Sequence, residues 1–143
     1  MNPPWDLRPA VAADVEEIAE LRAVVMRPDL ERLGRYDETY VRQRFRDGFS
    51  PGFTQVIESG GRFAGSVTLR PAEDGWVLEH FYLAPETQGR GLGTAVLLSL
   101  LERAEGTTVR LNVLQGSAAR RLYERHGFTV EAEDAVDVRM ARR

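Results

Sequence analysis

The chain has 143 residues, the length of one globular domain, so we expect a single domain over residues 1–143. Its formal net charge of −3 gives no general attraction to nucleic acid or to an anionic membrane, and neither is an expected partner. The absence of cysteine excludes a disulfide framework, a thiolate metal site and a cysteine nucleophile. Two histidines far apart in the sequence argue against a catalytic zinc site, so we expect no metal.

Two segments of the sequence bear on where in the cell the protein is located. Residues 1–5 lack the charge and the apolar core of a signal peptide. The longest apolar stretch, within residues 95–101, is far too short to span a bilayer. We therefore expect a cytoplasmic protein.

Hydrophobic periodicity and turn residues predict an α/β domain in which antiparallel strands come first and a helix crosses over near the end. The expected strands are residues 5–10, 54–58, 62–70, 76–83 and 107–114, with one or two more within 130–140. The expected helices follow Asp14, Asp37, the glycine turn near residue 91, and Ser117.

Local signals mark where these elements begin and end. Asp14 and Glu17 have the spacing of a capping box at the start of the first helix. Pro28 is expected to end that helix, which leaves residues 27–34 irregular. Gly60-Gly61 is a strong signal for a two-residue hairpin turn.

A glycine-rich turn, residues 83–94, joins the fourth expected strand to the following helix. Gly89, Gly91 and Gly93 leave the neighbouring backbone N–H groups unshielded by side chains. The first amides of a helix have no partner inside it, and the helix dipole favours negative charge there. The sequence therefore predicts a phosphate-binding site on the amides of this turn.

The glycine turn contains the motif Gln88-x-x-Gly91-x-Gly93. A second motif, Leu122-Tyr123-x-x-x-Gly127-Phe128, lies roughly thirty residues further along the chain. Together with the order of strands and helices, the two motifs resemble the GNAT superfamily of acyl-CoA N-acyltransferases. The resemblance implies one mixed, largely antiparallel sheet flanked by helices and splayed between its fourth and fifth strands. It also implies acetyl-CoA as co-substrate, a small-molecule or peptide amine as acceptor, and a homodimer as an assembly that the family often forms.

In that family the pantetheine arm lies in the splay and pairs with the backbone of the fourth strand. By this resemblance Phe81 and Leu83 contact the cofactor through their main-chain groups. The residues implied to wrap the pyrophosphate are Gln88, Gly89, Arg90, Gly91, Leu92, Gly93 and Thr94. The Arg90 side chain either meets the pyrophosphate or points to solvent.

One position departs from the family pattern. Many members carry an asparagine six residues before Leu122, which contacts the cofactor and caps the helix, whereas this chain has Gly116 there. Ser117 is expected to cap the helix instead and is a candidate cofactor contact. Asn112, on the preceding strand, is a candidate for a substitute amide.

Acetyl transfer to an amine requires the neutral amine, and an amine with a pKa of about 10.4 is almost wholly protonated at pH 7. Glu79 is the candidate base, because a carboxylate among apolar strand neighbours suits a polar cleft; an exposed strand position explains it equally well. Strict alternation would place Glu79 on the same strand face as Phe81 and Leu83, with His80 on the opposite face. We interpret His80 as a packed or solvated residue.

Tyr123 is the candidate general acid that protonates the departing CoA thiolate. Its spacing alone favours a tyrosine packed on the helix beside Leu122, but the family carries its catalytic tyrosine at this position.

A group of basic and aromatic residues lies in the segment that shapes the acceptor pocket in the family. Its members are Arg27, Arg35, Tyr36, Arg42 and Arg46. An arginine-rich rim suits a carboxylate-bearing acceptor such as an amino acid, but surface charge interspersed with acidic residues is the simpler interpretation.

These observations favour an acetyl-CoA-dependent N-acetyltransferase that works by direct attack in a ternary complex. One alternative is a non-catalytic acyl-CoA-binding or sensor module, which Tyr123 argues against and Gly116 argues for. The other is a scaffold or dimerisation unit, in which the glycines serve only tight packing between helix and strand.

Overall fold

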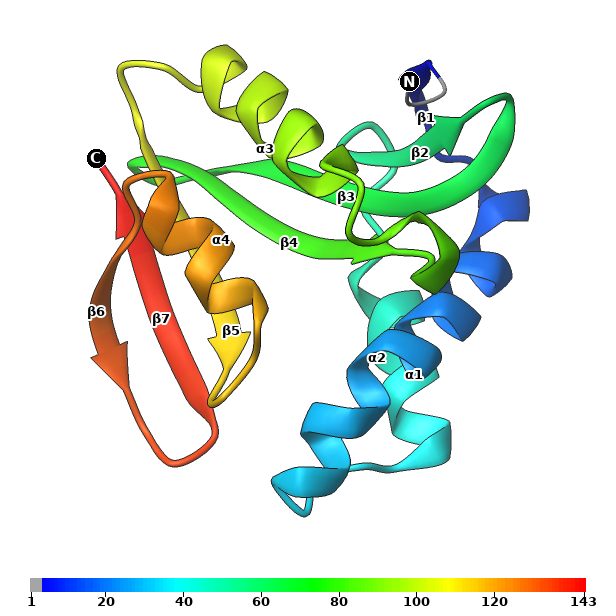
Figure 1. The fold of residues 1–143 in the computed structure, drawn as a ribbon, viewed down its shortest axis with the longest axis horizontal. Coiled ribbons are helices and arrows are strands. Elements are labelled where there is room, and N and C mark those ends of the chain that lie inside the picture. The colour runs from blue at the N-terminus through cyan, green and yellow to red at the C-terminus, as the bar shows by residue number, and fades with distance from the viewer. Residues whose placement is uncertain (1–3) are drawn as a thin grey trace.

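A computed structural model describes residues 4–143, so residues 1–3 of the N-terminal segment discussed above lie outside it. Seven strands form one mixed sheet in the order β1-β2-β3-β4-β5-β7-β6 (Figure 1). The strands are β1 (Trp5–Pro9), β2 (Thr54–Ser59), β3 (Arg62–Ala72), β4 (Gly75–Leu83), β5 (Thr108–Leu114), β6 (Thr129–Glu133) and β7 (Asp137–Arg142). The helices are α1 (Val15–Arg32), α2 (Glu38–Gly48), α3 (Leu92–Arg103) and α4 (Ala119–Arg125), with 3₁₀ turns η1 (Ala12–Asp14) and η2 (Pro85–Thr87). None of these helices combines the length and the apolarity that a membrane span requires.

The sheet is divided between β4 and β5. Every other neighbouring pair of strands is antiparallel, whereas β4 and β5 run parallel. They pair only at Gly75–Thr108, Trp76–Val109 and Val77–Arg110, and then diverge (Figure 1). The predicted splay between the fourth and fifth strands is confirmed.

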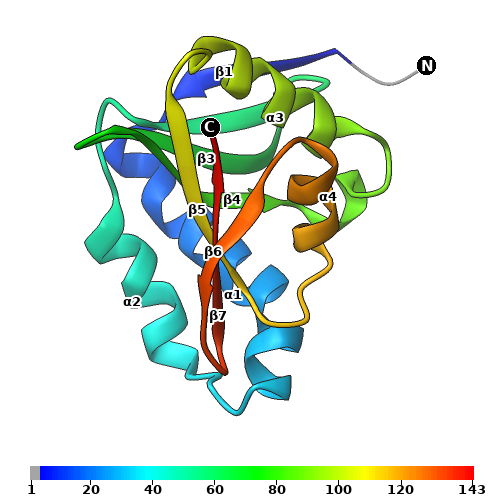
Figure 2. The same ribbon diagram turned by 90° about the vertical axis from the view of Figure 1, so that its left-hand side faces the viewer.

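Helices cover both faces of the sheet, α3 and α4 on one side and α1 and α2 on the other (Figure 2). The larger apolar cluster lies under α3 and α4 and includes Leu97, Val109 and Met140, all fully buried. A second cluster lies under α1 and α2 and includes Ile18, Phe45 and Val56. The core therefore consists of two apolar clusters on opposite faces of the sheet, and the split between β4 and β5 remains open.

The expected capping box at Asp14 is wrong. The Asp14 carboxylate accepts a hydrogen bond from the Val11 amide at 2.8 Å and pairs with the Arg8 guanidinium at 2.9 Å. It therefore closes η1, the short turn before α1, and does not cap α1 itself. In contrast, Asp37 caps α2, because its carboxylate accepts hydrogen bonds from the amides of Thr39 and Tyr40.

Pro28 does not end the first helix, which continues through it to Arg32. A proline inside a helix removes one hydrogen bond, the one to the carbonyl four residues earlier. That residue is Val24, which is 57% exposed, so water can satisfy the freed carbonyl. Buried Ile18 and Leu21 anchor the preceding turns, and the helix tolerates the loss.

Candidate active site

β4 carries one extra residue opposite β3 at His80, where the register between the two strands shifts. The backbone of His80 has a φ of +49°, in the left-handed region that residues other than glycine rarely adopt. The Ser66 hydroxyl donates a hydrogen bond to the His80 carbonyl at 2.8 Å and stabilises this bulge. A bulge places two successive side chains on the same side of a strand.

Because of the bulge, Glu79 and His80 both line one hollow, on the α2 side of the sheet. Phe81 and Leu83 instead pack against the cluster under α3 and α4. The expectation that Glu79 shares a face with Phe81 and Leu83, with His80 opposite, is therefore wrong. It assumed strict alternation, which the extra residue interrupts.

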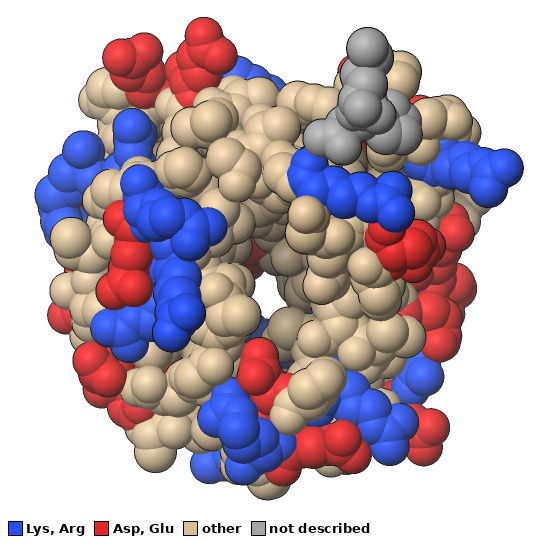
Figure 3. Space-filling view, viewed as in Figure 1, with Lys and Arg blue, Asp and Glu red and all other residues tan. Residues whose placement is uncertain are grey.

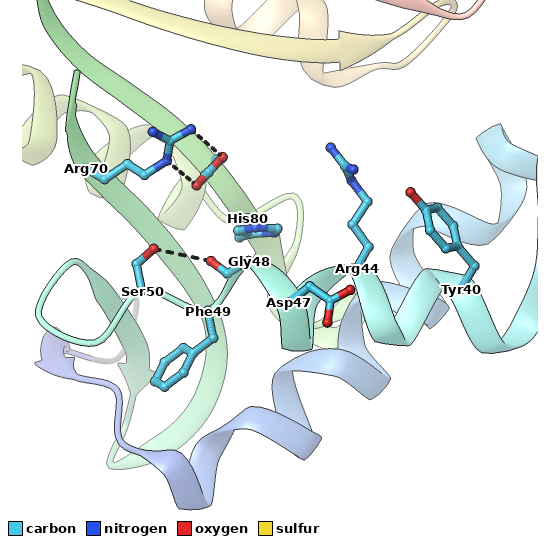
Figure 4. A pocket seen from close by; sticks show the side chains of 9 residues that line it. Tyr40, Arg44, Asp47, Gly48, Phe49, Ser50, Arg70 and His80 are labelled. Carbon is cyan, nitrogen blue, oxygen red and sulfur yellow. Dashed lines mark hydrogen bonds and ion pairs between the residues drawn. The ribbon is translucent and has the colours of Figure 1, made fainter. Parts of the chain in front are cut away.

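The hollow has a volume of about 390 Å³ and lies between α2, β3 and β4 (Figure 4). Its lining consists of Tyr40, Arg44, Asp47, Gly48, Phe49, Ser50, Arg70, Glu79 and His80. Sequence reasoning missed the α2 residues of this lining. Their signal is the spacing of Tyr40, Arg44 and Asp47, which puts all three on one face of a helix.

The Glu79 carboxylate is held by Arg70. The Arg70 Nε lies 2.7 Å from Oε2 of Glu79, and its Nη2 lies 3.4 Å from Oε1. This hydrogen bond to Glu79 raises the pKa of Arg70 above its usual value, so the guanidinium remains charged. Arg70 thereby orients the carboxylate at the wall of the hollow.

His80 belongs to a buried hydrogen-bond network. Arg22 Nε donates to the Tyr82 hydroxyl at 2.9 Å, and that hydroxyl lies 3.0 Å from Nδ1 of His80. Burial lowers the pKa of His80 to about 4, so the imidazole is neutral at pH 7. Because Arg22 can only donate, we assign the Tyr82 hydrogen to His80 Nδ1 and the imidazole proton to Nε2. His80 is thus a packed residue, as interpreted, and its Nε2 has no lone pair with which to accept a proton.

The glycine turn presents open backbone at the start of α3. Gly89 and Gly91 have φ values of +76° and +80°, and a Cβ added to either would meet no atom within 4 Å. Of the three glycines in this turn, Gly93 alone is closely packed, since a Cβ added to it would lie 3.2 Å from Cδ1 of Leu83. The amides of Leu92 and Gly93 have no hydrogen-bond acceptor among residues 4–143. Tight packing alone therefore does not explain the turn, whereas an anion on these amides does.

Tyr123 is in α4 and is 6% exposed. Its ring packs edge-on against Phe128, with centroids 5.6 Å apart. Burial, and then the neighbouring Tyr82, raise the pKa of Tyr123 well above its usual value, so the hydroxyl keeps its proton. Tyr123 lies in the cluster that Phe81 and Leu83 pack against, on the α4 side of the split.

The last turn of α1 reaches the loop between β5 and α4. Arg32 Nη2 donates to the carbonyl of Gln115, and Nη1 lies 2.8 Å from where a Cβ on Gly116 would be. This contact joins the far ends of the two halves that the split separates. Figure 3 shows the result, an opening that passes through the molecule.

Ser117 and Asn112, the two candidates to replace the asparagine that many family members have at the position of Gly116, lie in different surroundings. The N-cap of α4 is Ala118, without a side-chain cap, so Ser117 does not cap the helix as expected; its Oγ, one residue earlier, accepts a hydrogen bond from the Ala119 amide at 3.2 Å. Asn112 is exposed, and its Nδ2 donates to Asp137 of β7 at 2.8 Å. It alternates with Leu111 and Val113, which pack under α3 and α4, so it faces away from that side of the sheet. The structure does not give Asn112 the place of a cofactor donor.

The arginine-rich rim is mostly paired surface charge. Arg42 binds Glu20 and Arg46 binds Glu16, each at 2.7 Å. Arg27 pairs with Glu31 and lies over the Tyr36 ring, 4.7 Å from its centroid. The simpler interpretation of these residues is confirmed.

Comparison with known proteins agrees with this architecture. The profile of the Acetyltransferase (GNAT) family matches residues 15–128. The PaiA N-acetyltransferase of Thermoplasma acidophilum, crystallised with coenzyme A, has a TM-score of 0.77 and 21% identity, covering 98% of this chain and 99% of that one. The ribosomal-protein-S18-alanine N-acetyltransferase of Escherichia coli has a TM-score of 0.72 and 18% identity, covering 97% and 93%. An acyl-CoA N-acyltransferase from Pseudomonas aeruginosa has a TM-score of 0.67 and 20% identity, covering 99% of each chain.

The three structures share the fold of the present chain. The family profile covers most of the chain, from the start of α1 to Phe128, three residues past the end of α4, and includes both sequence motifs. The chain therefore belongs to the acetyltransferase (GNAT) family, whose enzymes use acetyl-CoA as co-substrate.

Proposed function

We propose that the protein is an acetyl-CoA-dependent N-acetyltransferase that acts on a primary amine by direct attack in a ternary complex. The observation that carries the proposal is the placement of Glu79 and Tyr123 on opposite sides of the split. Glu79 lines the hollow on the α2 side, and Tyr123 is a buried residue of α4. An opening passes through the molecule (Figure 3), which suits two substrates that approach from opposite faces.

The open backbone of the chain fits acetyl-CoA. The open amides of the turn, those of Leu92 and Gly93 among them, would bind the pyrophosphate, at about 1.5–3 kcal/mol for each hydrogen bond to a charged acceptor; the Gln88 amide already donates to the Pro85 carbonyl at 3.2 Å and would not take part. The edge of β4 beyond Val77, which β5 does not pair with, would bind the pantetheine arm through the main chain of Phe81 and Leu83. When bound, acetyl-CoA would supply the thioester carbonyl that the amine attacks, with the CoA thiol as leaving group.

Glu79 is the base in this proposal. An amine with a pKa of about 10.4 loses about 4.6 kcal/mol of driving force at pH 7, because so little of it is neutral. A carboxylate that Arg70 holds at the wall of the hollow is placed to receive the amine proton, directly or through one water molecule.

Tyr123 is the general acid in this proposal. Its buried hydroxyl remains protonated at neutral pH, so it has a proton to donate to the departing sulfur. The phenol and the carboxylate thus divide the two proton transfers, one on each side of the split.

The test is release of CoA thiol from acetyl-CoA in the presence of a panel of primary amines, combined with a thermal shift on acetyl-CoA alone. At 100 times its Kd, a ligand adds about 2.7 kcal/mol to the free energy of unfolding. A shift without thiol release would support the sensor module, and no shift would support the scaffold. All 19 residues counted as lysine or arginine are arginine, so lysine self-acetylation adds no background.

A further inference from the structure

One arginine of α2 differs from its neighbours in having no ion-pair or hydrogen-bond partner among residues 4–143. Arg42 and Arg46 are held by Glu20 and Glu16 of α1, away from the hollow. Arg44 forms no ion pair or hydrogen bond with any other residue in the described range 4–143. Its guanidinium group points into the space in front of Glu79 and His80 (Figure 4). A charged group left without a counter-ion in a hollow is available to a ligand.

The charge of Arg44 acts inside the hollow. Burial is the main cause of the low pKa of His80, and the positive charges of Arg22, Arg44 and Arg70 lower it further against the opposing effect of Glu79. Of the two arginines that line the hollow, Arg70 is bound to Glu79. Arg44 is therefore the lining cation whose hydrogen-bond donors remain unused.

The hollow carries the Glu79 carboxylate at one end and the Arg44 guanidinium at the other. Glu79 and Arg70 form the end at the sheet, next to the split. At the α2 end, the Tyr40 ring lies one turn before Arg44 and extends in the same direction (Figure 4). Asp47, the other carboxylate of the lining, accepts a hydrogen bond from Gln43 at 2.8 Å and points away from the Arg44 guanidinium (Figure 4).

These groups complement a molecule with an amine at one end and a carboxylate at the other. The parallel N–H groups of a guanidinium match the two oxygens of a carboxylate, and a phenol adds a third donor. A volume of about 390 Å³ is at the lower end of the range for small-molecule sites, which favours a free compound over a protein segment. We propose that the acceptor is a small primary amine that carries a carboxylate, with its amine at Glu79 and its carboxylate bound by Arg44 and Tyr40. The inference rests on the N-acetyltransferase function proposed above.

The first experiment compares matched acceptors. The full chain is assayed with acetyl-CoA and a panel of α- and ω-amino acids, each beside the amide in which a carboxamide replaces the carboxylate. The expected result is a kcat/KM for at least one free acid that exceeds that of its amide about tenfold or more, because the amide has lost a charge-assisted bidentate contact.

The second experiment locates the contact with variants. Arg44→Gln and Tyr40→Phe are expected to raise KM for the free acid about tenfold, with little change in kcat and no change for the amide. Tyr40 is 57% exposed and Arg44 is also exposed, so neither change threatens the fold. Arg46→Gln is the matched control, since it removes the same charge from the same helix outside the hollow.

The possible outcomes distinguish a failure of the carboxylate site from a failure of the proposed N-acetyltransferase function. Equal or better turnover of the amides, better turnover of peptide amines, or equal effects of Arg44→Gln and Arg46→Gln would overturn the carboxylate site while leaving an N-acetyltransferase. Binding of acetyl-CoA without turnover of any amine would overturn both.

Discussion

The guanidinium group of Arg32 occupies the space where a side chain on Gly116 would begin. A Cβ at that position would lie 2.8–2.9 Å from three guanidinium atoms, and Gly116 itself has a φ of +76°. Glycine suits this position because it adopts the positive φ readily, and because a larger residue would have to displace the flexible end of Arg32. The departure from the family pattern thus has a structural reason, and it no longer favours a module without catalysis.

The first prediction tests this relationship with a double-mutant cycle. Gly116→Asn keeps a residue that tolerates positive φ but displaces Arg32 from the Gln115 carbonyl. Arg32→Ala should cost about 1 kcal/mol of unfolding free energy in the parent chain and almost nothing in the Gly116→Asn chain. Urea denaturation measures all four proteins. Strictly additive costs would show that the two residues do not compete for the same space.

Tyr123→Phe should lower kcat about 100-fold, because it removes the proton-donating hydroxyl group and keeps the ring. The ring contact with Phe128 remains, so we expect the same thermal shift with acetyl-CoA. Tyr36→Phe is the control, since that ring lies under Arg27. An unchanged kcat in Tyr123→Phe would remove the phenol from the mechanism.

Glu79→Gln should depress the rate more at pH 6 than at pH 9, because at low pH nearly all of the amine needs a base to become neutral. Arg70 loses its partner in this variant but is partly exposed, so the loss of stability should be small. Arg70→Gln retains the carboxylate and should lose less activity. Parallel pH–rate profiles for Glu79→Gln and the parent would exclude Glu79 as the base.

The low pKa of His80 predicts a loss of stability in mild acid. The folded imidazole titrates at about 4 and an unfolded one at about 6.5, so between these values the unfolded chain binds more protons. Stability is therefore complete above about pH 6.5 and falls as the pH decreases towards 4. Urea unfolding at pH 5 should give a free energy on the order of 2 kcal/mol below that at pH 7. His80→Asn, in which asparagine tolerates the positive φ, should reduce this difference in unfolding free energy between pH 5 and pH 7. If the variant and the parent show the same difference, groups other than His80 cause it.

The parts of the fold that could be predicted from the sequence depend on local signals. Gly60-Gly61 forms the hairpin turn because both residues adopt positive φ, and Gly127 ends α4 in the same way. The glycine turn before α3 could be predicted for the same reason, since it needs positive φ at Gly89 and Gly91.

The parts that could not be predicted depend on contacts between distant segments. The bulge at His80 exists through the register between β3 and β4, and no residue near it marks the change. Arg44 looks like its two neighbours in the sequence, and only the partners that α1 supplies to Arg42 and Arg46 set it apart. The local rule that proline ends a helix predicted a stop at Pro28, but buried side chains elsewhere in α1 stabilise the helix enough for it to continue to Arg32.

The unpaired edge of β4 also bears on how the molecule avoids aggregation. A strand edge with unused peptide groups normally invites a strand of another molecule to pair with it. Here the edge lies inside a ring that Arg32 and Gln115 close, so an incoming strand of ordinary width is obstructed. The pantetheine arm proposed above is a single narrow chain, so the same closed ring that hinders a second strand would leave it room.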